Sequence, residues 1–148
     1  MPACVSWLRL DLACRYFAEE AATLACMVMG VQINAVAGKS ESRKYWIGDG
    51  LYGSMNCLLY DHAEVTAHRL GSGHAGTATD TLTYPSTVFG PSCDGLDVVL
   101  KDYALPELSY GDWLVFPCMG AYTLAGACDF NGMGISSESV KYIFSLAA

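Results

Sequence analysis

A cysteine and an aspartate with the potential for chemistry stand side by side at Cys93 and Asp94. They lie in the segment Gly-Pro-Ser-Cys-Asp-Gly-Leu-Asp, residues 90–97, whose proline and glycines indicate a tight turn. Such a turn can hold two short side chains beyond the edge of a sheet, where a thiol can donate a proton and a carboxylate can bind a cation. Because a lone cysteine in a loop is often a small buried hydrophobe, the pair alone leaves a purely structural role open.

The other cysteines and the histidines show neither a disulfide framework nor a metal site. Seven cysteines are an odd number, and they include no C-x-x-C pair, which favours a reducing, cytoplasmic location. Steps of six residues separate His62, His68 and His74, so one face would carry all three only in an unbroken strand, which Gly71 and Gly73 forbid. We therefore predict no metal.

Length and charge narrow the function classes. The 148 residues suit a single domain, and a net charge of −7 disfavours nucleic acid and anionic membranes as partners. The longest apolar run, residues 21–37, contains Gln32 and Asn34 and is too short for a membrane span. No basic segment precedes the apolar start of the chain, so we expect no signal peptide.

Hydrophobic periodicity predicts a short helix followed by strands. From Tyr16 the apolar residues recur at three- and four-residue steps, through Phe17, Ala21, Leu24, Ala25 and Val28. Near Met27 the period becomes two and continues to Ala35, as in a half-buried strand. The polar residues 38–44 should form a solvated loop; their Gly-Lys-Ser is not a phosphate-binding loop, because Ile33 stands where that motif needs its first glycine.

The rest of the chain also favours β-structure. Residues 45–62 are strand-like but broken by glycines, and residues 71–81 should form a surface loop. A second short helix is possible at 121–125. We predict further strands at about 82–89, 96–101, 112–117 and 140–146. The fold class expected is mainly β, with one or two short helices.

Three motifs, in this order and spacing, resemble eukaryotic-type ornithine decarboxylase. The resemblance runs from about Arg15 to Leu146, and the Phe-Asn-Gly of residues 130–132 continues it. Its motifs are Asp-Gly-Leu-Tyr-Gly-Ser (49–54) with Tyr-Asp-His (60–62), the segment 90–97, and Gly-Asp-Trp (111–113) with Met-Gly-Ala-Tyr-Thr (119–123). Diaminopimelate decarboxylases of the same superfamily carry Cys-Glu-Ser where this chain has Cys-Asp-Gly at 93–95, so the branch acting on basic amino acids is favoured.

The resemblance implies a fold and a domain division. The family combines a (β/α)8 barrel, which binds pyridoxal 5'-phosphate, with a C-terminal β domain of alanine-racemase type. Residues 27–148 match the β domain, a barrel- or sandwich-like sheet, and residues 1–26 comprise an N-terminal segment and the remnant of the link from the barrel. The barrel itself, with the lysine that holds the cofactor, has no match here, since no lysine of this chain stands in a corresponding context: Lys39, Lys44, Lys101 and Lys141.

The resemblance also implies a role for each candidate residue. Cys93 corresponds to the residue that protonates the α-carbon after CO2 leaves, and Asp94 to the acid that binds the distal ammonium of ornithine. Both reach across a dimer interface into the barrel of a partner subunit. Asp61 corresponds to a second substrate-binding acid. Tyr122 and Arg15 correspond to two residues that contact the cofactor phosphate, and Tyr52 corresponds to an aromatic residue at the interface.

One departure from the family lies at the N-terminal edge. Where the family reads Glu-Pro-Gly-Arg-Tyr, residues 12–16 read Leu-Ala-Cys-Arg-Tyr, so Leu12 replaces the glutamate that pairs with the pyridinium nitrogen. We hypothesise that residues 1–14 come from a truncated or misassembled reading frame, which the genomic sequence upstream would test.

Three functions stay open. The first is the C-terminal part of a homodimeric decarboxylase that makes putrescine for polyamine synthesis, with lysine or arginine as alternative substrates. The second is a non-catalytic regulator resembling antizyme inhibitor, which would pair with a full-length decarboxylase. The third is a non-functional fragment.

Overall fold

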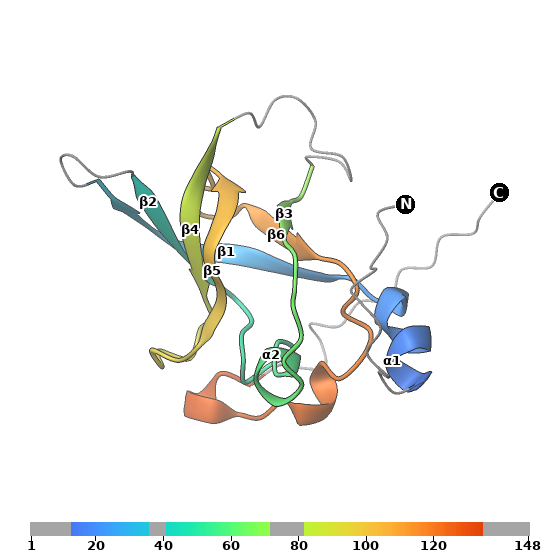
Figure 1. The fold of residues 1–148 in the computed structure, drawn as a ribbon. Coiled ribbons are helices and arrows are strands. Elements are labelled where there is room, and N and C mark those ends of the chain that lie inside the picture. The colour runs from blue at the N-terminus through green and yellow to red at the C-terminus, as the bar shows by residue number, and fades with distance from the viewer. Residues whose placement is uncertain (1–12, 36–40, 72–81, 135–148) are drawn as a thin grey trace.

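The computed structural model describes residues 13–35, 41–71 and 82–134, which form one curled sheet with short helices at its lower edge (Figure 1). The six strands follow the order β3-β6-β1-β2-β4-β5, and only the β2–β4 pair is parallel. They are β1 Leu24–Asn34, β2 Ser42–Ile47, β3 His68–Arg69, β4 Thr83–Phe89, β5 Val98–Pro106 and β6 Trp113–Phe116. The predicted mainly β fold is confirmed.

The helical segments among the described residues are short and lie outside the sheet. Two are α-helices, α1 Ala13–Ala18 and α2 Cys57–Tyr60. Three are 3₁₀ turns, η1 Glu19–Ala21, η2 Leu124–Gly126 and η3 Phe130–Gly132. No helix in the described ranges is long and apolar enough to cross a membrane.

Strand β1 joins the two halves of the sheet. Its first residues pair with β6, from Leu24 opposite Phe116, and its later residues pair with β2, from Val28 opposite Ile47. A register shift between Val28 and Gly30 marks an irregularity at the changeover, where an extra residue bends a strand and increases its twist. The sheet therefore curls and encloses its apolar face.

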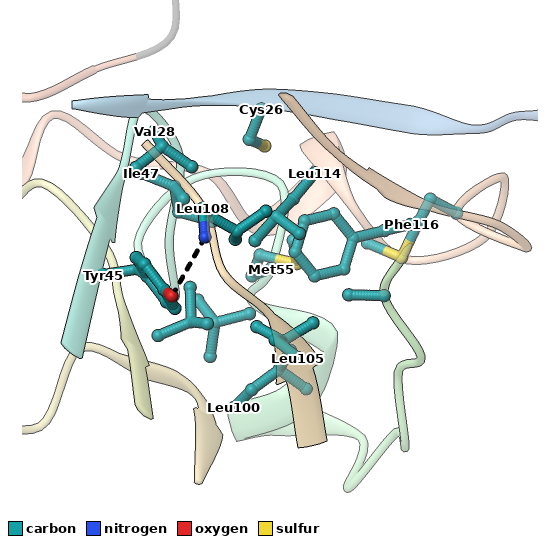
Figure 2. Packing of buried hydrophobic residues seen from close by; sticks show 14 of the residues in the cluster. Cys26, Val28, Tyr45, Ile47, Met55, Leu100, Leu105, Leu108, Leu114 and Phe116 are labelled. Atoms are coloured by element: carbon teal, nitrogen blue, oxygen red, sulfur yellow. Dashed lines mark hydrogen bonds between the residues drawn. The ribbon is translucent and has the colours of Figure 1, made fainter. Parts of the chain in front are cut away.

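Large apolar side chains from most strands fill that enclosed face (Figure 2). Tyr45, Ile47, Leu114 and Phe116 are fully buried. The one hydroxyl drawn in this core, that of Tyr45, accepts the backbone N–H of Leu108 at 3.2 Å, so its polar oxygen is satisfied. Burial raises the pKa of Tyr45, which keeps the phenol neutral.

The predicted boundary between the first helix and the first strand was wrong. Helical structure ends at Ala21, and β1 already begins at Leu24. Leu24 and Val28 match a helical spacing as well as a strand, and pairing of Leu24–Met27 with β6 decides the outcome. The proposed division into residues 1–26 and 27–148 stays a prediction.

The solvated loop predicted through Lys44 was also partly wrong, because β2 begins at Ser42. Arg43 lies in the sheet with a side chain 5% exposed, between Glu41 at 2.5 Å and Glu107 at 3.6 Å. Its guanidinium also lies 4.2 Å from the centre of the Tyr84 ring. Partners from just before β2 (Glu41), from β4 (Tyr84) and from just after β5 (Glu107) thus accompany the burial of this charged residue.

The strand-like prediction for residues 45–62 was wrong beyond Ile47, where β2 ends; residues 48–56 form turns and residues 57–60 form the helix α2. The predictions for β4 and β6 are confirmed within one residue at each end. Strand β5 starts two residues later than predicted and continues to Pro106, and the helix expected at 121–125 is the 3₁₀ turn η2. The helix α2 was not predicted, because glycines dominate the sequence before it. The strand expected at 140–146, His74 and all but the first residue of the 71–81 loop lie outside the described residues.

Candidate functional site

Two turns far apart in the sequence meet at one end of the sheet. Strands β2 and β4 run parallel, with Trp46 opposite Phe89 and their rings stacked at 5.5 Å. Because neighbouring parallel strands end at the same edge of a sheet, the segments that follow β2 and β4 lie close together. We call residues 48–56 the first turn and residues 90–97 the second turn; the second carries Cys93 and Asp94.

A buried carboxylate, Asp97, fastens these two turns together. It accepts the N–H of Leu51 at 2.8 Å from the first turn, and the N–H and hydroxyl of Ser92 at 3.1 and 2.5 Å from the second. A Cβ atom at Gly50 or Gly90 would collide with the Asp97 carboxylate, so both positions need glycine for a close approach. Local sequence did not predict this role of Asp97, although the glycines in both turns were a visible signal of a close approach.

A second buried acid, Asp49, shapes the first turn from within. Its Oδ1 accepts the N–H of Gly50 at 2.7 Å and the N–H of Ser54 at 2.9 Å. Burial raises the pKa of Asp49, and the hydrogen bonds from Ser54 and Gly50 offset part of that rise. The first turn therefore has a defined shape even though three glycines lie in it.

Cys93 and Asp94 in the second turn differ in their exposure and in their hydrogen bonds. Cys93 is exposed and has a φ of 61°, and its thiol lies 3.8 Å from the carbonyl of Pro91. Asp94 is half-buried: its Oδ2 accepts the hydroxyl of Tyr52 at 2.5 Å, and its Oδ1 accepts the N–H of Leu96 at 3.0 Å. These two bonds, that from Tyr52 first, hold the pKa of Asp94 below its usual range.

A third segment closes the site from the C-terminal side. The ring of Phe130 stacks on Tyr52, with centroids 4.0 Å apart and planes 14° apart. Asn131, at a positive φ of 52°, donates from Nδ2 to the carbonyl of Ser92 at 2.8 Å, and the N–H of Cys128 donates to the carbonyl of Tyr52. The contacts of Phe130 and Asn131 were not predicted from the sequence, where residues 130–132 only continue the resemblance to the family.

Asn56 attaches the same C-terminal segment to the start of α2. Its amide donates to the carbonyl of Gly53 at 2.6 Å and to the carbonyl of Thr123. A Cβ at Gly126 would lie 2.8 Å from the Asn56 side-chain oxygen, so this contact also requires a small residue. The 3₁₀ turns η2 and η3, orange and red, accordingly lie beside α2 in Figure 1.

Comparison with protein families identifies the domain that carries this site. Residues 15–120 match the family described as pyridoxal-dependent decarboxylase, C-terminal sheet domain. The chain belongs to this decarboxylase family. The predicted resemblance is confirmed, and the described sheet is the C-terminal sheet domain.

Relatives of this chain include an ornithine decarboxylase and an antizyme inhibitor. The chain is 55% identical over 126 residues to a chloroplastic ornithine decarboxylase of Nicotiana glutinosa, covering 83% of this chain and 28% of the relative. It is 41% identical over 141 residues to antizyme inhibitor 2 of Xenopus laevis, covering 90% of this chain and 30% of the relative. The chain thus spans less than a third of either relative.

A solved decarboxylase shares the fold. The arginine decarboxylase of Paramecium bursaria Chlorella virus, bound to agmatine, matches with a TM-score of 0.68 and 34% identity. The match covers 82% of this chain and 31% of the viral enzyme. The curled sheet is therefore the arrangement found in a decarboxylase of known structure.

The other residues predicted for the decarboxylase site lie away from the second turn in the sequence. Asp61 is exposed just after α2, and Tyr122 is 41% exposed at a positive φ of 54°. Gly120 packs against the backbone of Ala18 and donates to the carbonyl of Glu19, so the α1–η1 end lies beside the segment that leads to Tyr122. Arg15 lies in α1, and its side chain is outside the described residues.

Among the described residues, the fit to pyridoxal phosphate is limited to a contact with its phosphate group. Tyr122 offers a partly exposed phenol, whose hydroxyl can donate a hydrogen bond to a phosphate oxygen. The small pocket between the two turns contains no lysine; its lining is Asp49, Gly50, Tyr52, Gly53, Pro91, Ser92, Asp97 and Met133. Within the described ranges no group of three histidine, cysteine or acidic side chains is placed to hold a metal ion.

Proposed function

We propose that this chain is the C-terminal part of a pyridoxal-phosphate-dependent ornithine decarboxylase, which converts L-ornithine to putrescine and CO2. In this proposal Cys93 and Asp94 complete the active site of a dimer partner that has a full barrel. The observation that supports it is the exposed thiol and its neighbouring carboxylate on a turn that Asp97 fixes from beneath. Side chains that must enter another subunit need both exposure and a defined position.

Each residue of this chain would make a separate contribution. Pyridoxal phosphate, when bound, takes up the electron pair released as CO2 leaves. The Cys93 thiol would then donate its proton to the α-carbon, and Asp94, whose lowered pKa favours the carboxylate, would bind the distal ammonium. Asp61 would be a second acid near that ammonium, and Tyr122 with Arg15 would contact the cofactor phosphate.

Complementation tests this proposal. A full-length ornithine decarboxylase whose own corresponding cysteine is changed to alanine should regain activity when mixed with this chain, because the added subunit supplies Cys93. The chain alone, with ornithine and pyridoxal phosphate, should release no CO2 above background. Failure to restore activity despite a demonstrated heterodimer, or turnover by the chain alone, would contradict the proposal.

The Asp94→Ala variant tests the substrate-binding role. Loss of a charge-assisted hydrogen bond to the ammonium should lower the kcat/KM of the complemented enzyme by about 10- to 150-fold. Asp102→Asn is the matched control, because Asp102 is an exposed carboxylate on β5, beyond the second turn. Equal kcat/KM values for wild type and Asp94→Ala would remove Asp94 from substrate binding.

A second candidate function is regulation without catalysis. The 41% identity to antizyme inhibitor 2 supports it, whereas the presence of both Cys93 and Asp94 favours the enzyme. In the mixing experiment, a regulator with its cysteine intact would pair with the full-length enzyme and change that enzyme's activity without restoring the cysteine-deficient one. A non-functional fragment would instead aggregate, which light scattering would detect.

The proposal also covers which amino acid is the substrate and in which cellular compartment the protein is found. Ornithine is the substrate in the names of several relatives, while the viral neighbour is an arginine decarboxylase. Parallel assays with ornithine, lysine and arginine would rank them. A cytoplasmic location is proposed from the cysteine pattern, and a tagged chain would distinguish it from the chloroplast named for the Nicotiana relative.

A further inference from the structure

The hydroxyl of Tyr52 has a specific partner rather than a general packing role. It donates to Oδ2 of Asp94 at 2.5 Å, across 42 residues of sequence. Because Leu96 N–H occupies Oδ1, each oxygen of the carboxylate receives one donor from the protein. A carboxylate oxygen can accept two hydrogen bonds, so both oxygens keep capacity for a ligand.

The surrounding contacts restrict where this hydroxyl can lie. The Tyr52 ring is held face to face against Phe130, and its backbone carbonyl accepts the N–H of Cys128. Asp97 bonds to Leu51, the residue before Tyr52, and also to the turn that carries Asp94. Donor and acceptor are therefore fixed by the same buried carboxylate.

We propose that Tyr52 is a positioning residue, which orients the Asp94 carboxylate so that it binds the distal ammonium of the substrate. The substrate in this inference rests on the proposed function, whereas the role of Tyr52 rests on geometry within this chain. A residue needed only for packing would be replaced by phenylalanine without consequence, because the ring and its stacking would remain. The hydroxyl is the part that the proposal requires.

The charge state of the pair agrees with this geometry. The bond from Tyr52 is the largest cause that holds the pKa of Asp94 below its usual range. The same bond raises the pKa of Tyr52 to about 12, so the phenol keeps its proton wherever Asp94 is ionised near neutral pH. Near neutral pH the Tyr52 phenol is therefore protonated and can donate, while the Asp94 carboxylate is charged and can accept.

A titration of the chain by itself tests the role of the hydroxyl. In Tyr52→Phe, the pKa of Asp94, followed through its side-chain carboxyl signal by NMR, should rise toward the ordinary value. Tyr110→Phe is the matched control, because Tyr110 is 73% exposed in the turn before β6. An Asp94 pKa that is the same in wild type and Tyr52→Phe would overturn the proposal.

The reciprocal variant covers the case in which Tyr52→Phe does not fold. In Asp94→Asn, the pKa of Tyr52 should fall from about 12 toward the ordinary value of about 10, because the negative acceptor is gone. A Tyr52 pKa that stays near 12 in this variant would contradict the assignment.

Kinetics of the complemented enzyme test the effect on substrate. Tyr52→Phe should raise KM for ornithine about 3- to 10-fold, the size of one lost hydrogen bond, while kcat stays within about twofold. The acid limb of kcat/KM should move to higher pH, and Tyr110→Phe should do neither. With norvaline, which lacks the distal amine, Tyr52→Phe should have no effect on KM; an equal effect on both amino acids would contradict the proposal.

The two proposals fail separately. If the wild-type chain forms the heterodimer but does not complement, the proposed function is wrong, and the NMR titrations still decide whether Tyr52 controls Asp94. If complementation succeeds while Tyr52→Phe leaves KM, the acid limb and the Asp94 pKa unchanged, only the role of Tyr52 is wrong.

Discussion

The second turn has a tip and a base that use acidic side chains in opposite ways. At the tip, Cys93 is exposed and Asp94 is half-buried, with one protein donor on each carboxylate oxygen. At the base, Asp97 is buried and receives three donors from two turns. The tip keeps hydrogen-bonding capacity for a ligand, whereas much of the capacity of the base is used within the fold.

This contrast shows how a short polar turn can be rigid without a hydrophobic core of its own. The glycines that permit the Asp97 carboxylate to approach lie at the base, at Gly50 and Gly90. At Gly95, the glycine nearest the tip, an added Cβ would meet no atom within 4 Å. Sequence spacing alone does not separate these two kinds of glycine.

The largest expected effect comes from the tip, through Cys93→Ala in the complemented enzyme. Loss of the proton donor should lower kcat by about 10²- to 10⁴-fold, the usual range for general acid catalysis, with no change in the free energy of unfolding. Stopped assays of CO2 and putrescine would measure it. Cys128→Ser is the control, since Cys128 is also an exposed thiol; equal losses in both variants would deny Cys93 a special role.

A smaller effect, now on stability, comes from the base through Gly90→Ala. The new Cβ would meet the Asp97 oxygens, which three donors hold in place, so the free energy of unfolding should fall by about 1–3 kcal/mol. Gly95→Ala, in the same turn, should stay within about 0.5 kcal/mol of wild type. Urea denaturation of both variants measures the difference, and similar values would show that the base is not tightly packed.

The smallest effect is a difference in pH dependence between two carboxyl groups. The pKa of Asp94 is lowered on folding, so its stabilisation is present above the ordinary value of about 3.9 and is lost as pH falls through the lowered value. The pKa of Asp49 is raised, mainly by burial, so the folded protein loses stability as pH rises from the ordinary to the raised value.

Asparagine variants would reveal these opposite signs. Between pH 3 and pH 7, Asp49→Asn should gain stability relative to wild type as pH rises, whereas Asp94→Asn should lose it. Urea midpoints at several pH values provide the measurement. The same trend in both variants would mean that the two carboxyl groups do not differ in the way proposed.

Local sequence was a reliable guide where one periodicity dominates a segment. Strand β4 lies within one residue of its predicted range, and β6 lies inside its predicted range. Prediction failed at Leu24, where a helical spacing and a strand pairing compete, and at Arg43, whose burial depends on Glu41, Tyr84 and Glu107. In each failure at least part of the deciding contacts come from distant residues: β6 for Leu24, and Tyr84 and Glu107 for Arg43.

The amino-acid sequence by itself determined the fold class, the family and the chemical character of the Cys93–Asp94 pair, because residue types and motif order are local properties of the chain. Only the tertiary structure decided that Asp97 joins two turns and that Tyr52 bonds to Asp94 while it stacks on Phe130. These contacts join residues more than 40 positions apart, and no local pattern encodes them. The contacts of Asp97 and Asp94 with the first turn exist because the parallel pairing of β2 and β4 brings both turns to one edge of the sheet, whereas the stacking on Phe130 depends on the later segment around η3.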